Sequence, residues 1–137
     1  MSTTIRIEPA GDFHCRAEHG PSGADLTTDL PADNGGNGDR FSPTDLVATG
    51  LGTCMMTIMM KAAVRLEVDL SDLRIEVEKE MAAEPARRIG ALRTVIEMPR
   101  SLTTKQRTVL ERAALTCPVH KTLGDTVELP VEFRYPE

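Results

Sequence analysis

Alternating apolar and polar positions mark most of the strands that the chain is expected to form. The clearest run covers residues 73–81, where Leu, Ile, Val, Lys and Met alternate with Arg and Glu. A period of two places one set of side chains on one face of a strand. A turn at 82–88 separates this run from 89–98, its expected antiparallel partner. Shorter alternating runs predict four more strands, at 3–8, 13–18, 24–30 and 127–135.

A long stretch without charges predicts the central helix. Ser42 suits the N-cap, Pro43 the first helical position, and Asp45 the third, where its carboxylate can return to the cap. From Leu46 to Leu66 nearly every residue is apolar or small. That composition predicts a helix that is buried on all sides.

Two shorter helices are expected in the second half of the chain. Thr103 or Thr104 can cap a helix that ends near Leu115, and Cys117 followed by Pro118 begins a third, short helix. The resulting element order is βββ–α–ββ–α–α–β, without a linker long enough to divide the chain. Strands grouped around buried helices predict an α+β fold with a mostly antiparallel sheet.

Size and charge restrict the class of function. The chain has 137 residues and a net charge of −5, which predicts one domain over residues 1–137. It also argues against a nucleic-acid partner, because phosphate binding requires clustered Lys and Arg. The uncharged run at 46–60 is shorter than the roughly 20 residues of a membrane span, and residues 1–12 lack the apolar core of a signal peptide. We therefore expect a cytoplasmic protein without a membrane partner.

The three cysteines do not form a disulfide framework. Cys15 falls on the apolar face of its strand and is expected to face the core. Cys117 begins a helix, where backbone N–H groups and the dipole favour the thiolate, unless it serves only as a cap. Cys54 lies mid-helix in apolar surroundings that raise a thiol pKa, so it is an inert core cysteine unless a cation lies nearby. Arg40 is the first candidate for that cation and Arg16 the second.

The sequence gives little support for a metal or a bound cofactor. A zinc site from Cys54, Cys117 and His120 would lack a C-x-x-C pair and a fourth ligand. His14 and His19 are interpreted as solvated residues at strand ends. We therefore expect no metal and no cofactor.

Two stretches together resemble the paired cysteine motifs of the OsmC/Ohr family of thiol peroxidases: SPTDLVATGLGTC, which ends at Cys54, and CPVHKTL, which begins at Cys117. The expected order of strands and helices also resembles that family over nearly the whole chain. The resemblance implies an OsmC-like fold in which mostly antiparallel sheets wrap around central helices. It also implies an intertwined homodimer with active sites at the subunit interface, and an antioxidant role in the oxidative stress response.

The resemblance further implies a reaction. Cys54 would attack an organic hydroperoxide as a thiolate and become a sulfenic acid. Cys117 would condense with it to a Cys54–Cys117 disulfide, which an external dithiol such as a dihydrolipoamide protein would reduce. In the family an Arg–carboxylate pair stabilises the first thiolate, and Arg40 and Asp45 are the candidates here. The chain departs from the Ohr and OsmC branches, because Thr44 stands where their carboxylate follows the proline. Asp45 is therefore equally a capping residue, and the chain resembles a divergent third branch.

Two other functions are compatible with the same residues. One is a small-molecule or lipid-binding protein that has the fold but does not turn over peroxide. The other is a redox sensor whose disulfide alters the binding of a partner. The side chains of Leu51, Met55 and Ile58 would favour alkyl or lipid-like peroxides if they line a pocket at the thiol. Otherwise they belong to the core.

Overall fold

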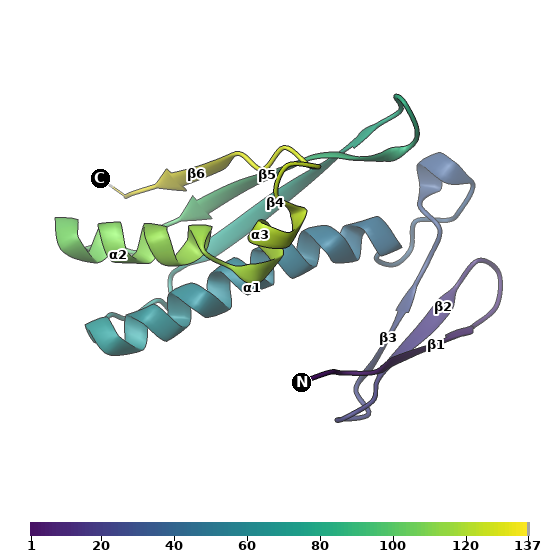
Figure 1. Ribbon diagram of the computed structural model, residues 1–137, viewed down its shortest axis with the longest axis horizontal. Helices are drawn as coiled ribbons and strands as arrows, with labels where there is room; N and C mark the ends of the chain where they lie inside the picture. Colours follow the sequence, from purple (N-terminus) through teal and green to yellow (C-terminus); the bar gives the residue numbers. More distant parts are fainter. Residues whose placement is uncertain (137) are drawn as a thin grey trace. The chain divides into compact units, whose positions relative to one another are not determined.

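The computed structural model describes residues 1–136. The strands and helices are β1 (Ile5–Pro9), β2 (Cys15–His19), β3 (Asp25–Thr28), α1 (Pro43–Leu66), β4 (Arg74–Ala82), β5 (Arg88–Glu97), α2 (Thr104–Leu115), α3 (Pro118–Leu123) and β6 (Val131–Arg134) (Figure 1). A short 3-10 helix, η1 (Ala32–Asn34), lies in the glycine-rich loop before α1. The expected element order and the α+β class are confirmed. By its internal contacts the chain forms two compact units, which divide between Leu46 and Val47 within α1.

The first unit contains an antiparallel meander in the order β1–β2–β3. β2 begins later than expected, because Phe13 has a positive φ of 63° and belongs to the preceding turn. Cys15 is exposed, so the expectation that it faces the core is wrong. A sheet buries a face only against a second layer. Within this unit the whole of β1 is exposed, and the alternation of β2 has no apolar layer to point into.

The second unit contains the sheet β4–β5–β6. β4 and β5 form the expected antiparallel hairpin, and Ile75 and Val77 lie on its half-buried face. β6 runs parallel to β5 and is shorter than the expected strand at 127–135. The reason is Pro130, which has no N–H to donate to a strand ladder. Its carbonyl still accepts a hydrogen bond of 2.9 Å from the Thr94 amide.

Helices α1 and α2 lie along one face of this sheet (Figure 1). Between these layers is the core of the unit, to which α1, β5 and α2 contribute the fully buried side chains Leu51, Met55, Met59, Leu92, Ile96 and Leu110. Gly52 allows this approach, because a Cβ at that position would lie 3.0 Å from Val77 Cγ2 on β4. Gly50 has open space around it instead, so only one of the two helix glycines is explained by close packing.

The expectation that α1 is buried on all sides is wrong for the described chain. Its buried residues form one stripe, Ala48, Leu51, Met55, Met59 and Ala63. A second stripe at helical spacing is exposed: Thr49, Thr53, Thr57, Met60 and Val64. The sequence pattern missed this arrangement because both stripes are uncharged.

By length and composition α1 is also the one helix among residues 1–136 that is apolar enough to cross a membrane. The central helix of a soluble protein meets the same criterion. The buried stripe of α1 packs against β5 and α2. The buried side of α1 is therefore apolar because it forms part of the core.

Candidate redox site

Cys54 and Cys117 come together within the second unit. Cys54 lies in the middle of α1, half-buried and packed against the core, whereas Cys117 is fully buried. Cys117 is the N-cap of α3, and its Sγ accepts a hydrogen bond of 3.2 Å from the His120 amide. The expected helix start at Cys117 is therefore confirmed. The Cys54 side chain lies close enough to Cys117 to act on it by hydrogen bonding and by charge.

The environment of Cys117 keeps its thiol protonated. Burial is the main cause that raises the pKa of Cys117, and the hydrogen bond and charge of Cys54 raise it further. The amide of His120 acts in the opposite direction but does not offset them. The amides at the helix start do favour the Cys117 thiolate, as expected, but desolvation outweighs them, so the net shift favours the protonated thiol. A buried, protonated thiol beside Cys54 suits a group that reacts second.

Alkylation should separate the three cysteines by exposure. When native protein is treated with iodoacetamide at neutral pH, we expect Cys15 to be alkylated much faster than Cys117, because Cys117 is both inaccessible and protonated. We expect at least about a tenfold difference in rate between these two thiols. Peptide mass spectrometry over a time course measures it. In denaturant all three rates should converge. Equal native rates for Cys15 and Cys117 would contradict the burial argument.

Asp45 takes the capping role that the sequence allowed. Its Oδ2 accepts a 2.9 Å hydrogen bond from the Ser42 amide, and its own amide donates to Ser42 Oγ at 3.1 Å. This reciprocal pair is a capping box, with Asp in place of the usual Glu. Asp45 lies about nine residues before Cys54 on α1. With a rise of about 1.5 Å per residue this is about 13 Å along the helix axis. The carboxylate therefore does not reach the thiol of its own helix.

The two candidate arginines differ in how firmly carboxylates hold them. Arg16 forms ion pairs with three acidic groups: Glu8 at 3.5 Å, Glu18 at 3.1 Å and Asp25 at 2.9 Å. Hydrogen bonds to Glu18 and Asp25 raise the pKa of Arg16 above its usual value. Arg40, in the loop before α1, is 40% exposed, and its Nε lies 4.0 Å from Asp39 Oδ1. Arg40 is therefore the cation that is less neutralised by its neighbours.

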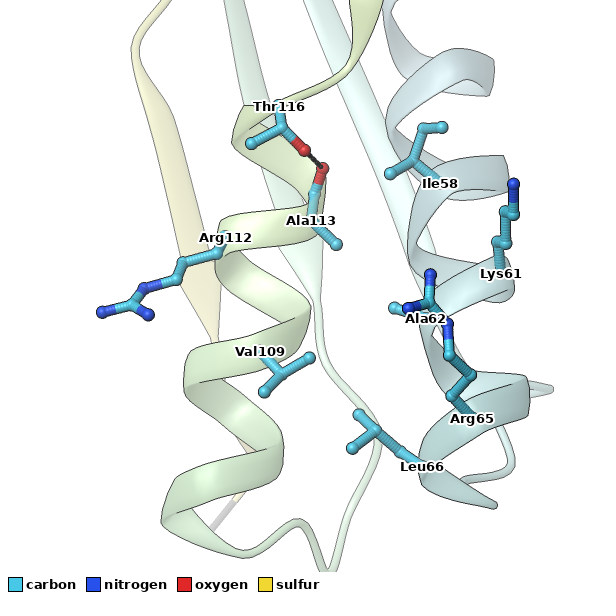
Figure 2. Close-up of a pocket in the computed structure, with 9 residues that line it drawn as sticks. All are labelled: Ile58, Lys61, Ala62, Arg65, Leu66, Val109, Arg112, Ala113 and Thr116. Atoms are coloured by element: carbon cyan, nitrogen blue, oxygen red, sulfur yellow. Dashed lines mark hydrogen bonds between the residues drawn. The ribbon is translucent and has the colours of Figure 1, made fainter.

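A groove of about 560 Å³ runs between α1 and α2. Figure 2 shows Ile58 and Leu66 of α1 opposite Val109 of α2, with Lys61 and Arg65 on the α1 side. Ile58 is the one residue of the expected apolar wall that lines this groove. Leu51 and Met55 are fully buried, so they belong to the core rather than to a substrate pocket.

One cluster was missed by sequence analysis. His14, interpreted as a solvated strand-end residue, is instead partly buried against Asp29 and Asp39. These residues come from three separate segments, and no short motif connects them. Only the fold of the first unit brings them together.

The site therefore consists of two neighbouring thiols in an α+β fold. One is half-buried on the central helix, and the other is buried at the start of a second helix. The chain belongs to the OsmC-like protein family, which it matches over residues 36–132. The fold is OsmC-like.

Solved structures agree with this assignment. A putative osmotic stress induced and detoxification response protein from Psychrobacter arcticus 273-4 is 37% identical, with a TM-score of 0.89 over 98% of this chain and 97% of that one. An organic hydroperoxide resistance protein OsmC from Legionella pneumophila is 22% identical, with a TM-score of 0.71 and coverage of 97% and 96%. The organic hydroperoxide resistance protein OhrB of Bacillus subtilis is 17% identical, with a TM-score of 0.68 and coverage of 98% of each chain. No curated protein matches the sequence significantly.

Proposed function

We propose that this protein is a cytoplasmic thiol-dependent peroxidase that reduces organic hydroperoxides, with Cys54 as the attacking thiol and Cys117 as the resolving thiol. The observation that supports this most directly is the interaction of the two side chains inside an OsmC-like fold. Cys54 is half-buried and Cys117 fully buried. A peroxide therefore has access to Cys54 first, and Cys117 lies ready for the second step.

The proposed reaction balances in three steps. The Cys54 thiolate attacks the outer oxygen of ROOH, the O–O bond breaks, and the alkoxide takes a proton and leaves as ROH. The resulting Cys54 sulfenic acid reacts with the Cys117 thiol, which forms the S–S bond and releases water. An external dithiol, for which dihydrolipoamide is the proposed type, reduces this disulfide and is itself oxidised to a disulfide. Two electrons pass from the dithiol to the peroxide in each cycle.

The activating charges are proposed to act in a homodimer. Cys54 requires a cation to favour its thiolate, and Arg40 is the candidate with the fewer close carboxylates. Asp45 is too far along α1 to touch the thiol of its own helix. If Asp45 takes part in the Arg–carboxylate pair, it does so at the Cys54 of the other subunit. The exposed stripe on α1 offers a surface for such a partner, because it repeats at helical spacing and carries no charge.

The test of this function is a coupled assay on the wild-type protein. Cumene hydroperoxide and hydrogen peroxide are supplied separately, with dihydrolipoamide as the reductant, and dithiol consumption is followed. We expect turnover with cumene hydroperoxide and a lower kcat/KM with hydrogen peroxide. An absence of turnover with this or any other dithiol would contradict the proposed peroxidase.

The exposed stripe gives a prediction about assembly. Val64→Glu places a charge on a residue that is 78% exposed in the single chain. We expect the wild type to be a dimer, and the variant to dissociate with a Kd raised by at least about tenfold, because a buried unpaired carboxylate is costly. Light scattering during size-exclusion chromatography over a range of concentrations measures it. Lys105→Glu, an exposed change on α2, is the matched control. A Val64→Glu dimer of unchanged affinity would exclude this face as the interface.

A second candidate function is supported by the groove between α1 and α2. Its apolar floor, together with Lys61 and Arg65 on one side (Figure 2), suits the chain and carboxylate of an amphiphilic acid. In this alternative the protein binds a small molecule or lipid without reducing it. Tight binding of a fatty acid by a wild type without peroxidase activity would favour it.

A further inference from the structure

Three side chains in the first unit converge on one point. His14 Nε2 lies 3.5 Å from Asp29 Oδ1 and 3.4 Å from Asp39 Oδ1. One potential ligand atom of each residue lies within 4.8 Å of those of the other two. His14 immediately precedes β2, Asp29 immediately follows β3, and Asp39 ends the glycine-rich loop before α1. The cluster contains no cysteine and is separate from the proposed redox site.

Two of the polar atoms that face one another in this cluster lack hydrogen-bond partners. Asp29 is only 1% exposed, and among the described residues neither its Oδ1 nor His14 Nε2 has a hydrogen-bond partner. Asp29 Oδ2 accepts one long bond of 3.4 Å from the Asp39 amide. Buried polar groups are normally satisfied, and each exception needs an explanation. Two orphaned atoms that point at each other call for a third group between them.

A proton shared by His14 and the carboxylates does not provide that group. Hydrogen bonds between nitrogen and a carboxylate oxygen are usually about 2.7–2.9 Å when charged. The separations here, 3.4 and 3.5 Å, are too long for good bonds. A tetrahedral ion with bonds of about 2.0–2.2 Å holds its ligand atoms about 3.3–3.6 Å apart. Both histidine–carboxylate distances match the edge of such a tetrahedron.

We infer that His14, Asp29 and Asp39 bind a divalent transition-metal ion, for which zinc is the expected occupant. One imidazole nitrogen and two carboxylate oxygens form a ligand set that zinc accepts, with water in the fourth position. Calcium and magnesium prefer sites made of oxygen alone.

A metal at this point would connect three segments of the first unit. It would tie the start of β2 to the end of β3 and fix the end of the glycine-rich loop, which has few apolar residues to hold it in place. The residue that follows Asp39 is Arg40. The ion is therefore a structural element that orders the loop leading to α1, and its binding does not depend on the proposed peroxidase activity.

Cobalt provides a spectroscopic test. The full-length protein is treated with a chelator, dialysed, and titrated with CoCl₂ while its absorption is followed, and zinc is then added as a competitor. We expect one cobalt per chain, visible ligand-field bands, displacement by zinc, and no near-ultraviolet band from a thiolate ligand. His14→Ala and Asp39→Ala should each weaken binding at least about tenfold, since even outer partners of metal ligands contribute that much.

Matched controls make the result specific. His19→Ala and Asp12→Asn remove an exposed histidine and an exposed carboxylate nearby in sequence, and both should bind cobalt as the wild type does. Asp39 is half exposed, so its replacement is expected to leave the fold intact, which circular dichroism checks. The inference is overturned if the wild type does not bind cobalt saturably, if binding survives both ligand substitutions, or if a thiolate band accompanies it.

Discussion

Replacing Cys54 by serine is expected to abolish peroxide-dependent turnover, with kcat/KM for cumene hydroperoxide lowered by roughly a thousandfold or more. A serine hydroxyl is not ionised at neutral pH and does not attack the O–O bond, and loss of a nucleophile leaves only binding. The dithiol-coupled assay measures the change. Cys15→Ser is the matched control, because Cys15 is an exposed thiol in the first unit. It should retain wild-type activity.

Cys117→Ser separates the two proposed steps. This variant should still reduce one equivalent of peroxide per subunit and accumulate a Cys54 sulfenic acid, which dimedone traps. Multiple turnover should fall, because the intramolecular disulfide does not form. In the wild type, one equivalent of peroxide should produce a 54–117 disulfide, detected by peptide mass spectrometry. Undiminished turnover by Cys54→Ser, or Cys15 in place of Cys117 in the disulfide, would contradict the assignment.

Local signals predicted much of the fold. The hairpin of β4 and β5 was predicted from the alternation at 73–81 and the turn that follows it, and this reasoning needs no knowledge of what covers the sheet. The helix starts follow from capping chemistry. Thr103 forms a capping box with Gln106, and Cys117 accepts the His120 amide. In each case the residues that make the contact lie within three positions of one another.

Features that depend on a second layer were predicted less well. The exposure of Cys15 and of one side of α1 is decided by what packs against them, and alternation or hydrophobicity alone does not report it. The raised pKa of Cys117 was missed for the same reason. The sequence reveals the helix start, which lowers the pKa, but not the burial, which raises the pKa by more. His14 and Asp29 meet only because β2 pairs with β3. The family resemblance supplied the pairing of the two thiols, which local patterns left open.

Replacing Arg40 by alanine is expected to lower kcat/KM about ten- to a hundredfold while leaving the free energy of unfolding within about 0.5 kcal/mol of the wild type. The side chain is 40% exposed and lies 4.0 Å from Asp39, so its removal costs the fold little. Its proposed role is to favour the Cys54 thiolate. The rate of Cys54 alkylation should therefore fall in parallel with activity at neutral pH.

The matched variants are Arg16→Ala and Asp45→Asn. Arg16 is held by Glu8, Glu18 and Asp25, so its loss should change activity less than about threefold. Asp45→Asn keeps a capping side chain and should destabilise by at most about 1 kcal/mol. If Asp45 is only a cap, activity is unchanged; a large loss would assign it to the Arg–carboxylate pair. An Arg16→Ala variant that loses more activity than Arg40→Ala would reverse the choice of arginine.

Mixed dimers determine which subunit supplies the arginine. Chains with Cys54→Ser and chains with Arg40→Ala are each expected to be nearly inactive. When they are unfolded together and refolded in equal amounts, half of the dimers contain one chain of each kind. If Arg40 acts on the partner's thiol, one of the two sites in such a dimer is intact, and the mixture recovers about a quarter of wild-type activity. If Arg40 acts within its own chain, no intact site forms and the mixture stays inactive. Because the proposed active site lies at the subunit interface, recovery is the result that we expect.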